Sequence, residues 1–207
     1  MQERIALYFE TLARLPLAAE VTDARGRTVP LHAFFTVAIA RMRATHAAGN
    51  KIMFVGNGGS AAIASHFAND FSKNGGMRAC CFTDGSALTC LGNDYGYEFV
   101  YAKQIEMHAR AGDLLIAISS SGNSKNILNA VDAARNAKCG VVTFSGFRPD
   151  NKLRALGDHN VYVGAEEYGF VEVTHEALIH AVLDIACGWG RETSDNNVGD
   201  YNKRLSA

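Results

Sequence analysis

A chain of 207 residues, 48% hydrophobic and 20% charged, has the length and composition of one globular domain with a single core. Its formal net charge of -1 argues against a nucleic-acid surface, which usually carries an excess of basic residues. No apolar run approaches the roughly 20 residues of a membrane helix, and the first ten residues do not resemble a signal peptide. The five cysteines lack the spacing of a metal site. We therefore expect a cytoplasmic protein with reduced cysteines and neither a nucleic acid nor a membrane as partner.

The first 48 residues contain two amphipathic helical patterns, separated near Gly26 and Pro30. Their apolar stripes exceed what one small sheet needs, so residues 1–48 are expected to form a helical extension that buries against sister subunits. We expect residues 49–190 to form the main domain. The polar residues 191–207 are expected to form a C-terminal surface extension.

From residue 49 onward, short apolar runs alternate with helical patterns. Near-continuous apolar runs are typical of strands buried on both faces, and this alternation predicts a parallel sheet. The sequence therefore predicts one α/β domain with a doubly wound, flavodoxin-like sheet, whose ligands bind beyond the carboxyl ends of the strands. The expected strands are 51–55, 78–83, 113–119, 140–145 and 160–163, and the expected helices lie near 60–73, 97–110, 123–138 and 171–187.

A glycine-rich turn, Gly-Asn-Gly-Gly-Ser at 56–60, follows the first expected strand and leads into a helix. Its glycines allow a tight turn and close approach of a ligand, and Ser60 can cap the helix. The N-terminus of a helix offers free N–H groups and a partial positive charge, which suit an anion. The spacing matches neither the dinucleotide-binding fingerprint nor the P-loop, and a plain strand-to-helix turn could look the same.

A second polar loop, Ser-Ser-Ser-Gly-Asn-Ser at 119–124, follows the third expected strand and again precedes a helix. Four hydroxyls and the unpaired amides of a helix start can cradle a phosphate without a lysine. Alone, it could be a polar loop in which Ser124 is an ordinary N-cap. Two such loops, each at the carboxyl end of a strand, favour a phosphate site.

These two loops together resemble the sugar isomerase (SIS) domain. With His-Phe-Ala at 66–68 and Gly-Asn-Asp-Tyr-Gly at 92–96 between them, the chain from about residue 45 to 187 resembles the phosphoheptose isomerases. The resemblance implies a SIS fold and an enzyme of heptose biosynthesis that converts sedoheptulose 7-phosphate into a D-glycero-D-manno-heptose 7-phosphate. It also implies a homotetramer that commonly carries zinc.

The resemblance also assigns site residues. It implies that the residues that contact the phosphate or form its loop are Ser60, Ser119, Ser120, Ser121 and Ser124. It implies that the residues that contact the sugar are Asn57, Gly58, Gly59, Asn93 and Asp94.

The acid–base groups lie on two helices. His66 and Asp70 are four residues apart and share a helix face. On the last helix, an arc of ~140° holds Glu172, His175, Glu176, Ile179 and His180, at 100° per residue. Such polar groups are costly to bury unless they bind something, although buried, hydrogen-bonded histidines and solvent-facing acids would explain each residue singly.

By the resemblance, the zinc ligands are His66, Asp70, Glu172 and His180. Asp70 and His180 are also expected to transfer the proton between C1 and C2 of the sugar, through an enediolate, and Glu172 to lie in the substrate-binding region. Two residues depart from the family pattern, which has Glu at position 70 and Gln at position 172. A register shifted by three residues, matching an aromatic-Gly-aromatic pattern at 168–170, would deprive His180 of its role.

Two alternatives to an enzyme remain at this point. Relatives of the same family serve as protein-binding adaptors associated with replication initiation, and a sugar-phosphate sensor would bind without turnover. A carboxylate at 70 and a histidine at 180 favour the isomerase.

Overall fold

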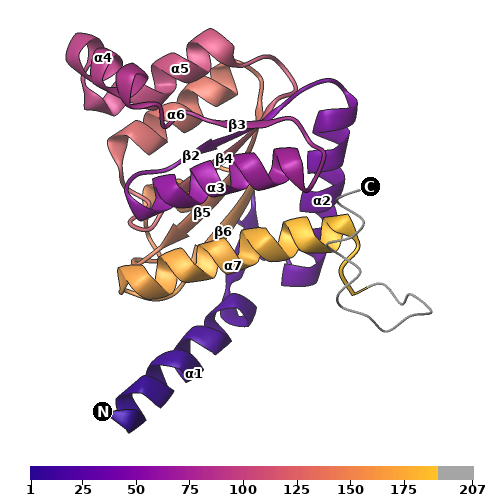
Figure 1. Cartoon of the computed structure of the whole chain (residues 1–207), viewed down its shortest axis with the longest axis vertical. Helices are drawn as coiled ribbons and strands as arrows, with labels where there is room; N and C mark the ends of the chain where they lie inside the picture. Colours follow the sequence, from indigo (N-terminus) through magenta and orange to yellow (C-terminus); the bar gives the residue numbers. More distant parts are fainter. Residues whose placement is uncertain (191–207) are drawn as a thin grey trace.

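A sheet of six strands lies between two layers of helices in the computed structural model, which describes residues 1–190 (Figure 1). The strand order is β1-β6-β5-β4-β2-β3. The strands from β2 to β6 pair in parallel, and β1 pairs antiparallel with β6. The strands are β1 Glu20–Asp23, β2 Ile52–Val55, β3 Ala79–Cys81, β4 Leu114–Ser119, β5 Gly140–Gly146 and β6 His159–Val163.

Helices cover both faces of this sheet, as expected of a doubly wound fold. On one face, α2, α3 and α7 pack in a core around Phe54 and Ile116. On the other face, α4, α5 and α6 pack around Met53 and Leu115, the neighbours of those residues on the same strands. The helices are α1 Gln2–Ala18, α2 Leu31–Ala47, α3 Gly59–Lys73, α4 Gly85–Tyr95, α5 Val100–His108, α6 Lys125–Asn136 and α7 Tyr168–Cys187, with 3₁₀ turns η1 Tyr97–Phe99 and η2 Lys152–Ala155.

The α/β class and the five parallel strands are confirmed, but the expected strand count was one too low. β1 lies inside the stretch that we expected to be only helical. It has four residues, and Val21 is its only fully buried side chain, so no alternating pattern could reveal it. The turn after β1 is stabilised by Asp23, whose Oδ1 accepts hydrogen bonds from the backbone N–H groups of Arg25 and Arg27.

Helix α4 was also missed, and the helix expected at 97–110 is the turn η1 followed by α5. α4 contains two glycines, a threonine and a cysteine, which are weak helix formers. Its N-cap is nonetheless clear in the structure, because Asp84 Oδ1 accepts a hydrogen bond from Ala87 N at 2.9 Å.

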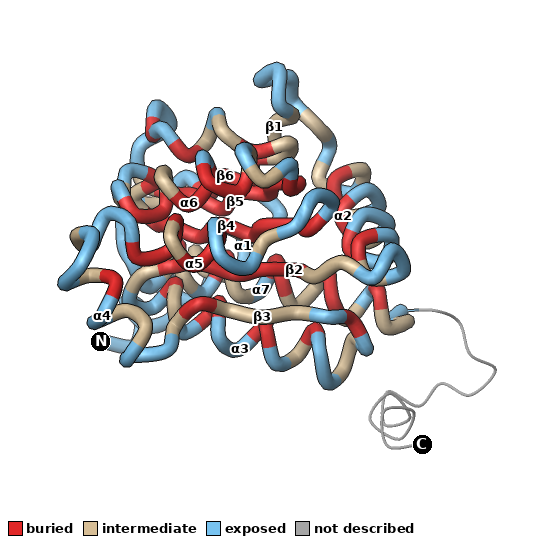
Figure 2. The backbone as a smooth tube through the Cα atoms, turned by 90° about the horizontal axis from the view of Figure 1, so that it is seen from above, coloured by how far each residue is buried: buried red, intermediate tan, exposed pale blue. Residues whose placement is uncertain are grey.

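The two N-terminal helices differ in their packing. Phe34, Ala38 and Met42 of α2 are buried in the sheet core, whereas α1 has no buried residue and projects beyond α7 (Figure 1). The central strands are buried along their length (Figure 2), and the loops at their ends reach the surface. No helix within residues 1–190 is long and apolar enough to cross a membrane. The expected extension at 191–207 lies outside the described residues.

Candidate functional site

The glycine-rich turn at 56–60 joins β2 to α3 at the carboxyl edge of the sheet. A Cβ on Gly56 would lie 2.4 Å from the Ser60 carbonyl oxygen, so only glycine fits there. Gly58 has a φ of 53° and is the N-cap of α3. Ser60 therefore lies one residue inside the helix, buried, rather than at the cap position that we expected.

Asn57 in this turn is held by a network that the sequence did not reveal. Its side-chain amide exchanges two hydrogen bonds with the Asn126 amide of α6, both 2.8 Å long. The Tyr97 hydroxyl of η1 donates a third hydrogen bond to Asn57 Oδ1 at 3.1 Å. Tyr101 in α5 donates from its hydroxyl to the Gly56 carbonyl oxygen. The turn is thus fixed in place by residues from α5, α6 and η1.

The serine loop at 119–124 joins β4 to α6 at the same edge, because β2 and β4 are parallel neighbours. Ser119 Oγ accepts a hydrogen bond from Gly122 N at 3.2 Å and lies 3.4 Å from Ser124 Oγ. Ser121 Oγ accepts one from Asn123 N at 3.3 Å. Ser120 is buried, and its hydroxyl has no hydrogen-bond partner among the described residues. These hydroxyls lie directly before α6, and the N-terminus of a helix is the kind of place that suits an anion.

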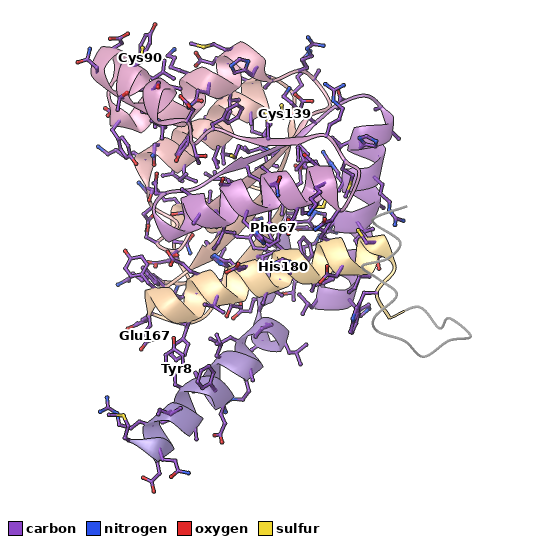
Figure 3. All side chains as sticks on the ribbon, viewed as in Figure 1. Tyr8, Phe67, Cys90, Cys139, Glu167 and His180 are labelled. Carbon is purple, nitrogen blue, oxygen red and sulfur yellow. The ribbon has the colours of Figure 1, made fainter. Side chains whose placement is uncertain are left out.

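The predicted acid–base residues meet between α3 and α7. His66 Nε2 lies 3.2 Å from His180 Nε2 and 3.3 Å from Asp70 Oδ2. One ligand atom from each of the three residues lies within 4.8 Å of the other two. Figure 3 shows His180 on α7 facing Phe67 on α3, and their ring centroids are 4.7 Å apart.

The donor set of this cluster suits a metal ion of borderline softness. Two imidazole nitrogens and one carboxylate oxygen are typical zinc ligands, and three protein ligands are typical of a catalytic zinc site. The side chain of His66 is 45% exposed and that of Asp70 is 15% exposed, so small molecules can reach the cluster.

Glu172 does not join this cluster. It precedes His180 by eight residues on α7, about 12 Å along the helix axis. Its carboxylate lies instead against Gly59, where a Cβ would come within 2.3 Å of Glu172 Oε2. Burial raises the pKa of Glu172 above its usual value. The structure therefore places Glu172 beside the glycine-rich turn and outside the cluster.

His175, on the same arc of α7, points into the core. It is fully buried, and its Nε2 lies 3.1 Å from the Ser145 carbonyl oxygen. Burial lowers the pKa of His175 to about 4, so the ring is neutral near pH 7. His175 is therefore a buried, hydrogen-bonded core histidine, which is the alternative explanation that the sequence left open.

Asn93 and Asp94 belong to α4, an element separate from both loops. They occupy the last turn of α4, not a loop, and both are exposed. Asn93 Nδ2 donates to Asp94 Oδ1 at 2.9 Å, and no hydrogen bond joins either side chain to the two loops. The chain from α4 does lead to Tyr97, the residue that reaches Asn57.

Comparison with known proteins agrees with this geometry. The SIS domain family model matches residues 34–146. Phosphoheptose isomerase of Helicobacter hepaticus is 40% identical over 156 residues, which span 72% of this chain and 79% of the relative. Phosphoheptose isomerase of Aliarcobacter butzleri is 41% identical over 66% of this chain and 75% of its own length.

Solved structures show the same likeness. The structure of phosphoheptose isomerase from Neisseria gonorrhoeae superposes with a TM-score of 0.77 at 36% identity, covering 89% of this chain and 98% of that chain. The phosphoheptose isomerase from Francisella tularensis gives the same TM-score at 25% identity, over 90% and 97% of the two chains. These relatives favour an isomerase over an adaptor or a sensor. The chain belongs to the phosphoheptose isomerase family of SIS-domain proteins.

Proposed function

We propose that this chain is an aldose–ketose isomerase that converts sedoheptulose 7-phosphate into a D-glycero-D-manno-heptose 7-phosphate. The proposal rests mainly on one observation, the meeting of His66, Asp70 and His180 on α3 and α7. α3 begins at the glycine-rich turn, and six residues of helix separate Ser60 from His66, about 9 Å of rise. That separation is comparable to the distance between the phosphate and the C1–C2 end of a heptose 7-phosphate.

The phosphate end of the substrate is assigned to the two loops. Backbone amides and hydroxyls of the serine loop surround the anion, and the turn at 56–60 approaches it closely because glycines leave the backbone open. The binding energy of this remote group orients the reacting carbons without taking part in the chemistry. The phosphate-binding residues are proposed to be Ser60, Ser119, Ser120, Ser121 and Ser124, and the sugar-binding residues Asn57, Gly58, Gly59 and Glu172.

The reacting end is assigned to Asp70 and His180. Isomerisation removes a proton from one carbon and returns it to the neighbouring carbon, while a carbonyl oxygen gains a proton and a hydroxyl loses one. A carboxylate and an imidazole, both joined to His66 in one cluster, can share these transfers. The neighbouring ring of Phe67 limits the positions that His180 can take.

The same cluster is proposed to hold zinc through His66, Asp70 and His180, because its nitrogen and oxygen donors fit that ion. When bound, zinc would polarise the sugar's carbonyl oxygen and stabilise negative charge on it. Glu172, the fourth ligand implied by the family resemblance, is left out of this set because its carboxylate lies on Gly59.

A homotetramer is proposed as the active form. The apolar residues of α1 support this proposal, because the helix buries none of its residues in its own domain, and Leu7 and Phe9 are 60% and 61% exposed. Asn93 and Asp94 are proposed to reach the sugar across a subunit contact. The five cysteines are all unpaired, which supports a cytoplasmic location.

The test is turnover of sedoheptulose 7-phosphate by the purified protein, followed by NMR with zinc added and after chelation. The proposal predicts an aldoheptose 7-phosphate product, and activity that chelation lowers and zinc restores. Absence of product under both conditions, from protein that still binds the substrate, would refute the isomerase. Activity that chelation leaves unchanged would refute the zinc assignment alone.

A further inference from the structure

A hollow lies at the amino ends of the parallel strands, opposite the serine and glycine loops at their carboxyl ends. It has a volume of about 400 Å³ and is lined where β2, β3 and β4 begin. At about 3.3 Å per residue, β2 and β4 separate this hollow from the serine and glycine loops by roughly 13 to 20 Å. The hollow is therefore a separate place on the molecule. Its polar lining includes Asn50, Lys51, Arg78, His108, Arg110 and Asp113.

The carboxylate in this lining is already neutralised. The side chain of Asp113 is 1% exposed, and its Oδ2 lies 2.5 Å from Lys51 Nζ. The backbone N–H groups of Lys51 and Arg110 donate to its two oxygens at 2.9 and 2.8 Å. Three donors thus occupy Asp113, so it does not repel an anion entering the hollow as a free carboxylate would.

Arg78 and Arg110 supply positive charge without a counter-ion. Both residues are exposed, and neither guanidinium forms an ion pair or hydrogen bond with any residue of the described part of the chain. The chain's net charge is -1, so this pair is a local excess and not part of a basic surface. A guanidinium offers five donors in a planar fork that matches the oxygens of a phosphate.

The floor of the hollow is held in a fixed shape. The His108 ring stacks on Phe82, with centroids 6.1 Å apart and planes at 15°. The His108 carbonyl oxygen also accepts a hydrogen bond from Lys51 Nζ at 2.6 Å. Arg78 is anchored through its backbone N–H, which donates to His46 Nδ1 at 3.1 Å. The two guanidiniums remain free to adjust to a ligand.

The size of the hollow exceeds that of a bare phosphate ion and lies in the range of small-molecule sites. A neighbouring hollow of about 520 Å³ shares Lys51 and Arg78 with it. We propose that this cationic hollow binds a small phosphate monoester, such as a sugar phosphate. Arg78 and Arg110 hold the phosphate, and the organic part rests on His108. This site is distinct from the catalytic site and does not depend on the isomerase assignment.

The test is calorimetric titration of the full chain with glucose 6-phosphate and, separately, with inorganic phosphate. The variants are R78Q/R110Q, R110Q alone, and S121A to weaken the serine loop. R25Q is the matched control, because Arg25 is an exposed arginine without a side-chain partner among the described residues, on the turn after the opposite edge strand β1. Thermal melts check that each variant is folded.

We expect the S121A protein to retain a glucose 6-phosphate site. Adding R78Q/R110Q to the S121A protein should weaken its affinity for glucose 6-phosphate at least tenfold. R110Q alone should weaken it less, and R25Q should leave it unchanged. Equal affinity for glucose 6-phosphate in the S121A protein with and without R78Q/R110Q would overturn the proposed site. Loss of inorganic phosphate binding in R78Q/R110Q, with no glucose 6-phosphate binding in any variant, would overturn the assignment to a monoester.

Discussion

The two ends of the candidate active site are built differently. In the glycine-rich turn and the serine loop, which are proposed to bind the substrate, backbone amides and short polar side chains bond to one another, as in the Asn57–Asn126 pair and the serine loop. At the reacting end, three side chains on two helix faces meet around His66, whose side chain is 45% exposed. Many donors share the proposed binding of the phosphate, whereas the proposed proton transfer depends on single side chains. Single changes should therefore cost much more at the reacting end.

The largest effect is expected for His180→Ala. Removing a general acid or base typically lowers kcat by about 10²–10⁴-fold, and the phosphate loops are untouched. Steady-state kinetics should show this fall with KM changed by less than about threefold, since uniform binding is retained. His32→Ala, at an exposed histidine of α2, is the matched control. A variant His180→Ala with ordinary kcat would remove this residue from the mechanism.

Asp70 tests the reacting end by charge. Asp70→Asn keeps the size but loses the carboxylate, so kcat should fall by about 10²-fold and the zinc content, measured by mass spectrometry, should drop. Asp70→Glu keeps the charge and should lose much less of both. If Asp70→Asn kept the kcat of the original chain, the carboxylate would not be needed and the proton-transfer role would be wrong.

Asn126→Ala tests the phosphate end through a residue that we do not place in contact with the reacting carbons. It leaves the Asn57 amide without its two 2.8 Å hydrogen bonds. A hydrogen bond contributes about 0.5–1.5 kcal/mol net, so we expect the loss of two to raise KM by roughly tenfold and to change kcat little. Tyr97→Phe removes one of three bonds to Asn57 and should have a smaller effect. An unchanged KM in both variants would show that the network does not position the turn.

The smallest effect at neutral pH is expected for His175, which lies on the same helix as His180. The pKa of His175 is lowered to about 4 by burial, against about 6.5 in the unfolded chain. The unfolded chain therefore takes up a proton first, and stability that is complete above pH 6.5 is lost as pH falls towards 4, by up to about 3 kcal/mol.

His175→Gln can still donate to the Ser145 carbonyl oxygen but does not titrate. Urea unfolding at pH 7 and pH 4.5 should show a smaller loss of stability for this variant than for the original chain. Equal losses in the two proteins would mean that His175 is not the group responsible.

The same contrast explains what could be predicted from the sequence. The two loops can be predicted from local sequence, because their glycines and serines directly follow apolar runs. His66 and Asp70 share a helix face, so their proximity follows from spacing alone. Their meeting with His180 required the family resemblance, because no local rule places α7 beside α3.

Other features depended on tertiary contacts. Asn126 looked like one polar residue of a helix, and its pairing with Asn57 links positions 69 residues apart. Glu172 lies on the expected face of α7, but its position along the helix axis places its carboxylate against Gly59 rather than in the His–Asp–His cluster. β1 is too short to produce a pattern, and α4 is composed of weak helix formers.

The most direct test of the central claim is deuterium exchange during turnover. In D₂O, proton transfer by Asp70 and His180 through an enediolate should place deuterium at C1 or C2 of the heptose 7-phosphate, detected by NMR. The account predicts incorporation by the original chain and a loss of about 10²-fold or more in His180→Ala, although that variant still binds the substrate. Incorporation at the original rate in His180→Ala would contradict it.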